Sequence, residues 1–174
     1  LSAGHETVAD LAEADVILVN TCGFIESAKT EAIENILEAC SYKQQNPELK
    51  VIVTGCLAER YRSQIEEEIP EVDAVVGCAS KKAIDTIVDR LFHGEDHLES
   101  YGAKKDFPLG GKRVIGTPAH YAYLKIAEGC NNRCHYCAIP GIRGPLHSRD
   151  MADCVAEARW LAGEGVKELI VVAQ

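Results

Sequence analysis

Short apolar runs alternate with helical patterns over the first half of the chain. Residues 16–19, 51–53 and 74–76 form brief runs that are rich in Val and Ile and lie next to Gly, Asn or Thr. Such runs are typical of strands that are buried on both faces of a parallel sheet. The hydrophobic pattern therefore predicts three parallel strands in this part of the chain.

Amphipathic stretches lie between these runs. In the longest stretch, apolar residues recur at helical spacing, at Ile25, Ala28, Ala32, Ile36 and Ala39. The Asn46-Pro47 pair then ends the helical pattern. Shorter helices are predicted over residues 6–14, 58–68 and 81–92. This alternation of helices and strands predicts an α/β fold with a doubly wound parallel sheet.

The pattern changes after residue 94. Residues 95–118 are rich in Gly and Pro and show little periodicity, as expected of a linker. A strand is predicted over 121–126, a helix over 150–163 and a further strand over 169–174, with Asp150 as the helix N-cap. Strand, helix and strand in this order make one βα step of a barrel or of an open sheet.

These patterns divide the chain into three parts. We assign residues 1–94 to a first domain, 95–118 to the linker and 119–174 to the start of a second domain. Leu1 is not an initiator Met, and the last residues resemble a buried strand with nothing after it. We therefore expect a fragment that lacks both ends.

The composition limits the classes of protein to which the chain can belong. With 174 residues, of which 47% are hydrophobic and 26% charged, it is ordinary globular material. No apolar run approaches the roughly 18 residues of a membrane span, and no secretory signal opens the chain. Eight cysteines without such a signal indicate a cytoplasmic protein whose thiols serve metals or chemistry. The net charge of −9 favours a basic protein partner over nucleic acid.

Three cysteines of one short loop carry the main chemical signal. Cys130, Cys134 and Cys137 are separated by three and then two residues. Three thiolates leave one iron of a 4Fe-4S cluster open to a small molecule, whereas an electron carrier normally covers all four irons. No fourth cysteine follows until Cys154, so the spacing favours a cluster with an open iron.

Two other interpretations of the loop remain open. Zinc could be bound by the three thiolates together with His135 or His147. Structural zinc sites usually pair two short knuckles across a longer gap, which is why we favour the iron-sulfur cluster. A redox dithiol formed by Cys134 and Cys137 is a weaker alternative, because it leaves Cys130 unexplained.

The first domain places further cysteines directly after predicted strands. Cys22 and Cys56 each follow such a strand and lie next to small residues that allow a ligand to approach the backbone. A second metal site and two buried thiols that only pack are equally good interpretations. Cys78 has a similar context and is a possible third ligand, whereas Cys40 and Cys154 fall within helical patterns as packing residues.

The chain resembles the radical S-adenosylmethionine (radical SAM) methylthiotransferases. Residues 121–144 contain the cysteine loop with Tyr136 before its last cysteine, and Ser148-Arg149 follows. Residues 20–29 and 54–61 are similar to the amino-terminal domain of the same family. The resemblance covers nearly the whole chain and is strongest to the RimO type, which modifies an aspartate of small-subunit ribosomal protein twelve.

The resemblance implies a radical reaction. Cys130, Cys134 and Cys137 would hold a 4Fe-4S cluster whose open iron binds S-adenosylmethionine beside Tyr136. One electron, from a reductant such as flavodoxin or ferredoxin, would cleave this cofactor to a 5'-deoxyadenosyl radical. The radical would then remove hydrogen from the β-carbon of the aspartate, because the C–H bond there is too inert for acid-base chemistry.

The resemblance also assigns the cysteines of the first domain. Cys22 and Cys56 would be two of three ligands of a second 4Fe-4S cluster that delivers sulfur, and the remaining ligand would lie upstream of Leu1. Under the resemblance Cys78 is not a ligand, and His147 stands where the family commonly has Arg. With these parts missing, we expect the fragment to be inactive by itself.

The main rival function is methylthiolation of a tRNA adenosine by the sister type of the same family. Gly23-Phe24-Ile25 and Ala138-Ile139 look more like the ribosomal-protein type. A zinc-binding or electron-transfer module without turnover is the alternative from another class. Arg143 and Arg149 are expected either to pair with carboxylates of cofactor or substrate or to remain as solvated loop charges.

Overall fold

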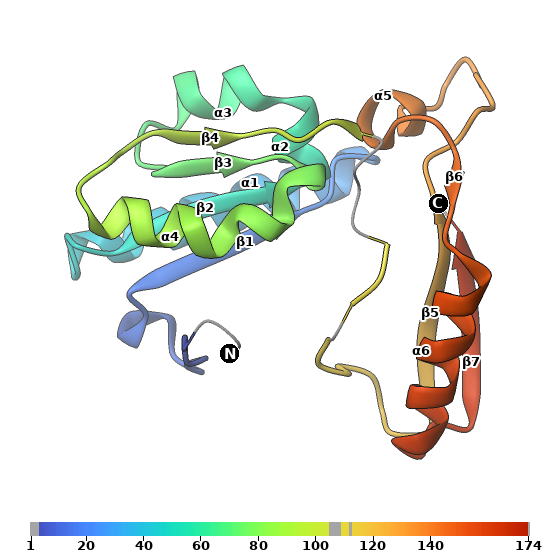
Figure 1. Ribbon diagram of the computed structural model, residues 1–174. Coiled ribbons are helices and arrows are strands. Elements are labelled where there is room, and N and C mark those ends of the chain that lie inside the picture. The colour runs from blue at the N-terminus through green and yellow to red at the C-terminus, as the bar shows by residue number, and fades with distance from the viewer. Residues whose placement is uncertain (1–3, 105–108, 112, 174) are drawn as a thin grey trace. The chain divides into compact units, whose positions relative to one another are not determined.

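The computed structural model describes residues 4–104, 109–111 and 113–173. The chain forms two compact units, Leu1–Ala103 and Lys104–Gln174, which are described separately below. Figure 1 shows the helices and strands of both units.

A parallel sheet of four strands forms the centre of the first unit. Its strand order follows the order in the chain, so each strand pairs with the next one. The strands are β1 (Val16–Thr21), β2 (Lys50–Gly55), β3 (Ala74–Val76) and β4 (Leu98–Ser100). The first three confirm the strands that the apolar runs predict.

Helices cover both faces of this sheet (Figure 1). The helices are α1 (Glu26–Ser41), α2 (Cys56–Arg60), α3 (Arg62–Glu68) and α4 (Ile84–Phe92), with 3-10 turns η1 (Leu11–Glu13), η2 (Tyr42–Gln44) and η3 (Cys78–Ala83). Val53 of β2 belongs to the core that Ile36 of α1 and Ile65 of α3 complete. Ile52 points to the opposite face, where Leu91 of α4 packs. The structure thus confirms an α/β sheet that is buried on both faces.

Three predicted features of this unit are wrong in part. The helix predicted over 6–14 is only the turn η1, because the apolar side chains Val8 and Leu11 remain 48% and 41% exposed and a short helix without packing is marginal in water. The helix predicted over 58–68 is two helices that meet at Tyr61, whose φ of −121° and ψ of 32° are not helical. The helix predicted over 81–92 begins as the 3-10 turn η3.

The segment predicted as a linker contains secondary structure. β4 lies within residues 95–118 and pairs with β3, and the first unit extends to Ala103. Only Leu98 of this strand is buried, so its sequence carries almost no strand signal and its backbone pairing defines it. Residues 105–108 and 112 of the same segment lie outside the described residues.

The second unit is built on a sheet of three strands. β5 (Tyr121–Glu128) lies in the middle, with β6 (His147–Ser148) antiparallel on one side and β7 (Glu168–Ala173) parallel on the other. α6 (Met151–Gly163) packs Leu161 against Ala122 of β5. Strand, loop, helix and strand follow one another as predicted.

The limits of α6 agree with its predicted signals. The Asp150 carboxylate accepts a hydrogen bond of 2.7 Å from the Ala152 N–H, which makes it the N-cap. Gly165 adopts a positive φ of 93° shortly after the helix ends. The sequence patterns did not predict β6 or the short helix α5 (Ile139–Arg143). Within the part of the chain that the structure describes, no helix has the length and apolarity needed to cross a membrane.

Candidate functional site

The cysteine loop leaves the carboxyl end of β5, where a βα unit normally carries its site. Cys134 is exposed, and Cys130 and Cys137 are partly buried. The Cys137 N–H donates to the Cys134 carbonyl oxygen at 3.0 Å, which folds this end of the loop into a tight turn. All three thiols are therefore on one short, partly exposed segment.

Backbone hydrogen bonds close the base of the loop. The Cys130 N–H donates to the Gly144 carbonyl oxygen over 3.1 Å. The Leu146 N–H donates to Asn131 Oδ1 over 3.0 Å. The residues on either side of the loop are thus tied to each other, although they are more than a dozen positions apart in the sequence.

Gly129 is required where the loop begins. Its φ is +76°, and a Cβ added there would clash with the Pro145 carbonyl oxygen and lie 2.7 Å from that of Gly144. These are backbone atoms, which cannot move aside as a flexible side chain could. A side chain at position 129 must therefore shift the whole base of the loop.

We expect Gly129→Ala to destabilise the second unit by about 1–3 kcal/mol, the usual cost of a strained backbone position. Because the loop base would move, iron content after anaerobic reconstitution should also fall. Denaturant unfolding and iron analysis measure the two effects. Gly141→Ala is the matched control, since a Cβ at Gly141 meets no atom within 4 Å. Equal stability and iron content in both variants would contradict this role of Gly129.

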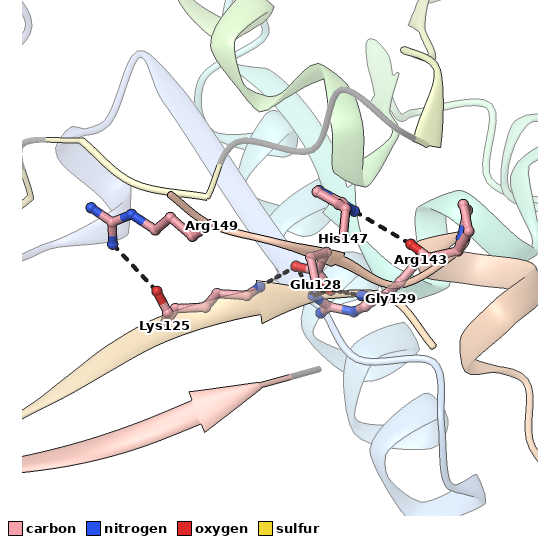
Figure 2. Close-up of polar contacts among 7 residues, drawn as sticks. Lys125, Glu128, Gly129, Arg143, His147 and Arg149 are labelled. Carbon is pink, nitrogen blue, oxygen red and sulfur yellow. Dashed lines mark hydrogen bonds and ion pairs between the residues drawn. The ribbon is translucent and has the colours of Figure 1, made fainter. Parts of the chain in front are cut away.

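A buried carboxylate lies beneath the loop. Glu128, the last residue of β5, is 0% exposed. Arg143 Nη1 approaches its two carboxylate oxygens at 3.0 and 3.1 Å, and the Lys125 ammonium group also pairs with it. The Gly129 N–H donates to the same carboxylate at 3.3 Å. Figure 2 shows Lys125 and Arg143 reaching this group from different sides.

Arg143 and Arg149, which follow the cysteine loop, pair with carboxylates of the chain itself. Arg143 binds Glu128, and Arg149 binds Glu157 of α6. Arg149 also donates to the Lys125 carbonyl oxygen at 3.3 Å (Figure 2). In this structure neither guanidinium is a solvated loop charge, and each fixes elements of the second unit.

The two histidines considered as zinc ligands are placed differently. His135 lies exposed in the cysteine loop. His147 lies opposite Glu128 in the backbone pairing of β5 and β6, and its Nδ1 lies 3.3 Å from the Pro145 carbonyl oxygen. Its Nε2 is buried without a hydrogen-bond partner among the described residues. Among residues 4–104, 109–111 and 113–173, no three Cys, His, Asp or Glu side chains are grouped closely enough to hold a metal ion. The described residues thus group neither His147 with the loop cysteines nor Cys130, Cys134 and Cys137 with one another.

The donor set of the loop nevertheless suits an iron-sulfur cluster. The structure places none of the eight cysteines, all of which it describes, in a disulfide. Thiolates are the ligands that such clusters take, and the segment that bears Cys130, Cys134 and Cys137 is accessible. Three thiols on one closed loop therefore fit a cluster that is bound at three corners.

Cys22 and Cys56 lie at the same edge of the first sheet. They directly follow β1 and β2, whose last residues Thr21 and Gly55 are paired in register. A Cβ on Gly23 would lie 2.9 Å from the Cys56 carbonyl group, so the backbones carrying the two thiols are in close contact. Cys22 is exposed, and Cys56 is buried at the start of α2.

Contacts around this edge hold the two segments together. Gly55 has a φ of +103°, and a Cβ there would lie 2.7 Å from the Thr21 backbone N. Arg60 Nη1 donates to the Gly23 carbonyl oxygen over 3.2 Å. Cys78 follows β3 at the same edge but is only 1% exposed, and its N–H donates to Glu59 Oε2 over 3.0 Å. No sequence pattern marks Glu59 or Arg60, because their contacts join residues that are far apart in the chain.

The remaining residues considered in the sequence are either buried within helices or exposed on the cysteine loop. Cys40 and Cys154 are buried in α1 and α6, as predicted for packing residues. Burial raises the pKa of the Cys40 thiol to about 11, which disfavours the thiolate that a metal requires. Tyr136 is 91% exposed beside Cys137.

The first unit also contains a groove of about 420 Å³ between α1 and α3. Side chains such as Ile33, Leu37 and Tyr61 line it. None of the cysteines predicted as ligands lines this groove. The groove therefore does not mark the predicted metal chemistry.

Both units of the chain are similar to known proteins. Residues 1–77 match the family described as "Uncharacterized protein family UPF0004", and residues 124–174 match the "Radical SAM superfamily". Three relatives share the name "Ribosomal protein uS12 methylthiotransferase RimO". They are 51% identical in Acetivibrio thermocellus, 46% in Caldicellulosiruptor saccharolyticus and 47% in Clostridioides difficile. The alignments cover 97%, 99% and 98% of this chain. The chain spans only 39%, 39% and 38% of the length of these relatives.

Proposed function

Because the chain belongs to the RimO type of the radical SAM methylthiotransferase family, we propose that its protein adds a methylthio group to ribosomal protein uS12. The observation that carries the proposal is the identity of 51% to a relative of this name over 97% of the chain. The closed loop with three accessible thiols, which falls in the stretch similar to radical SAM proteins, supports it.

Under this proposal Cys130, Cys134 and Cys137 hold a 4Fe-4S cluster on the loop after β5. A cluster held there would supply an open iron for S-adenosylmethionine and the electron for its cleavage to methionine and a 5'-deoxyadenosyl radical. The chain's own contribution is to fix the three thiols, through the hydrogen bonds of the loop base. The exposed ring of Tyr136 stands beside the last thiol, where it can cover the bound cofactor.

We further propose that Cys22 and Cys56 are ligands of a second 4Fe-4S cluster, which is the source of the transferred sulfur. Their support is the close contact of the segments that follow β1 and β2. The target is the β-carbon of an aspartate of the ribosomal protein, and the electron donor is a small reductant such as flavodoxin or ferredoxin. A fragment without the remaining parts of the protein should be inactive.

Mass spectrometry of a strain that lacks the gene tests the proposed substrate. We expect the methylthio mass increment to be lost completely from ribosomal protein uS12 and to remain on tRNA. The reason is that no second enzyme is expected to carry out the same difficult substitution on this protein. Reintroduction of the gene should restore the increment. Loss from tRNA adenosine, with the ribosomal protein unchanged, would instead establish the sister activity.

A further inference from the structure

Glu128 is a fully buried carboxylate at a position where the chain could have placed an apolar residue. It is 0% exposed, and it follows the buried Ala127 at the end of β5. Burying a carboxylate is costly unless charged partners and hydrogen bonds compensate it. Arg143 at 3.0 and 3.1 Å, Lys125 and the Gly129 N–H supply this compensation.

Glu128 and Arg143 lie at the two ends of the cysteine loop. Glu128 is the last residue of β5, and the loop begins with the next residue. Arg143 is the last residue of α5, which directly follows the loop. The pair therefore spans all three cysteines, and the nearby Cys130 to Gly144 hydrogen bond closes the same base.

Burial strengthens the electrostatic attraction between Glu128 and Arg143. The Arg143 side chain is 20% exposed and that of Glu128 is 0% exposed, so water screens their attraction only weakly. Removing the carboxylate would leave the cations of Lys125 and Arg143 without their buried partner, which is far worse than losing a surface ion pair.

We propose that Glu128 and Arg143 are positioning residues that clamp the cysteine loop closed before the cluster is bound. The clamp holds the ends of the loop together, so that only the residues between them have to be ordered when the cluster assembles. This inference rests on the proposed function, because it gives the clamped loop its cluster.

A second buried ion pair of the same unit provides a matched control. Arg149 and Glu157 have side chains that are 8% and 9% exposed, and they pair as closely as Glu128 and Arg143 do. Both residues follow the cysteine loop in the chain. Arg113, which also pairs with Glu157 at 3.0 Å, lies before β5, so neither pair joins the two ends of the loop. Replacing Glu157 should therefore weaken the fold without opening the loop.

The test compares Glu128→Gln, Arg143→Gln and Glu157→Gln in the complete protein. In the metal-free form, hydrogen exchange of the amides in residues 129–144 should become about tenfold faster in the first two variants. Iron bound after anaerobic reconstitution should fall to about half or less, as for other groups that orient metal ligands. In Glu157→Gln, the unfolding midpoint should fall while loop exchange and iron content match the wild type.

A conservative variant separates clamping from simple loss of structure. Arg143→Lys keeps the cation and should recover part of the loop protection that Arg143→Gln loses. For each variant, the EPR signal of the reduced cluster is recorded with and without S-adenosylmethionine. Per iron bound, the fraction that responds to the cofactor should fall in Arg143→Gln by about twofold or more and recover in Arg143→Lys.

The outcomes distinguish the clamp from the proposed function. Wild-type loop exchange in Arg143→Gln would overturn the clamp, even if Glu128→Gln failed to fold. Equal loop opening in Glu157→Gln would overturn it as well, because the effect would then be one of general stability. A wild-type protein that shows the clamp but binds no cluster would instead refute the proposed function.

Discussion

Replacing Cys130, Cys134 or Cys137 with Ala is expected to abolish formation of 5'-deoxyadenosine in the complete protein. Each change removes one of the three thiols on the loop after β5. Among the described residues, no other group of Cys, His, Asp or Glu side chains could hold a metal in its place. Changes to residues that merely orient ligands already cost about 10–100-fold in metal affinity or activity, so loss of a ligand should cost more. Chromatography of reaction mixtures with dithionite and S-adenosylmethionine measures the product.

Cys154→Ala is the matched control for this experiment. Cys154 belongs to the same unit but is buried in α6, so its thiol packs against neighbours and should not reach a cluster. We expect this variant to retain iron and to form 5'-deoxyadenosine. Normal product formation by Cys134→Ala would show that the loop does not hold the cluster.

The fold could be predicted wherever the local pattern and tertiary packing agree. β2 is recognisable because Val51, Ile52 and Val53 are buried on alternating faces of the sheet. The edge strand β4 could not be found in the same way, since only Leu98 is buried and the strand exists through backbone pairing with β3. The helix predicted over 6–14 failed for the opposite reason, because its larger apolar side chains, Val8 and Leu11, do not pack into the core.

The candidate ligands could be predicted from the sequence, but the contacts that hold their loop in place could not. Cysteine spacing identifies Cys130, Cys134 and Cys137, because a short loop can bring its own residues together. The ion pair between Glu128 and Arg143 joins residues 15 positions apart, and its existence depends on the three-dimensional course of the loop. The alternation along β5 did not mark Glu128 either, because the pairing with β7 shifts register between Lys125 and Ala127 and interrupts the alternation that Ala122 and Leu124 begin.

Replacing Cys22 or Cys56 with Ala should separate the two parts of the proposed reaction. These thiols follow β1 and β2 in the first unit, whereas the radical chemistry is assigned to the loop of the second unit. We therefore expect 5'-deoxyadenosine to remain measurable while methylthiolated product falls below detection. Mass spectrometry of a uS12 peptide and chromatography of the nucleoside give both quantities from one reaction.

Cys78→Ala is the control, because it tests whether the loss of any cysteine at this sheet edge prevents formation of the product. Cys78 lies beyond β3 at the same sheet edge and is buried as Cys56 is, but its N–H donates to Glu59 Oε2 and the family resemblance gives it no role as a ligand. The variant should still form methylthiolated product. If Cys22→Ala made full product while Cys78→Ala made none, the sulfur source would have to be reassigned to the thiol beyond β3, because edge position alone cannot distinguish the three cysteines.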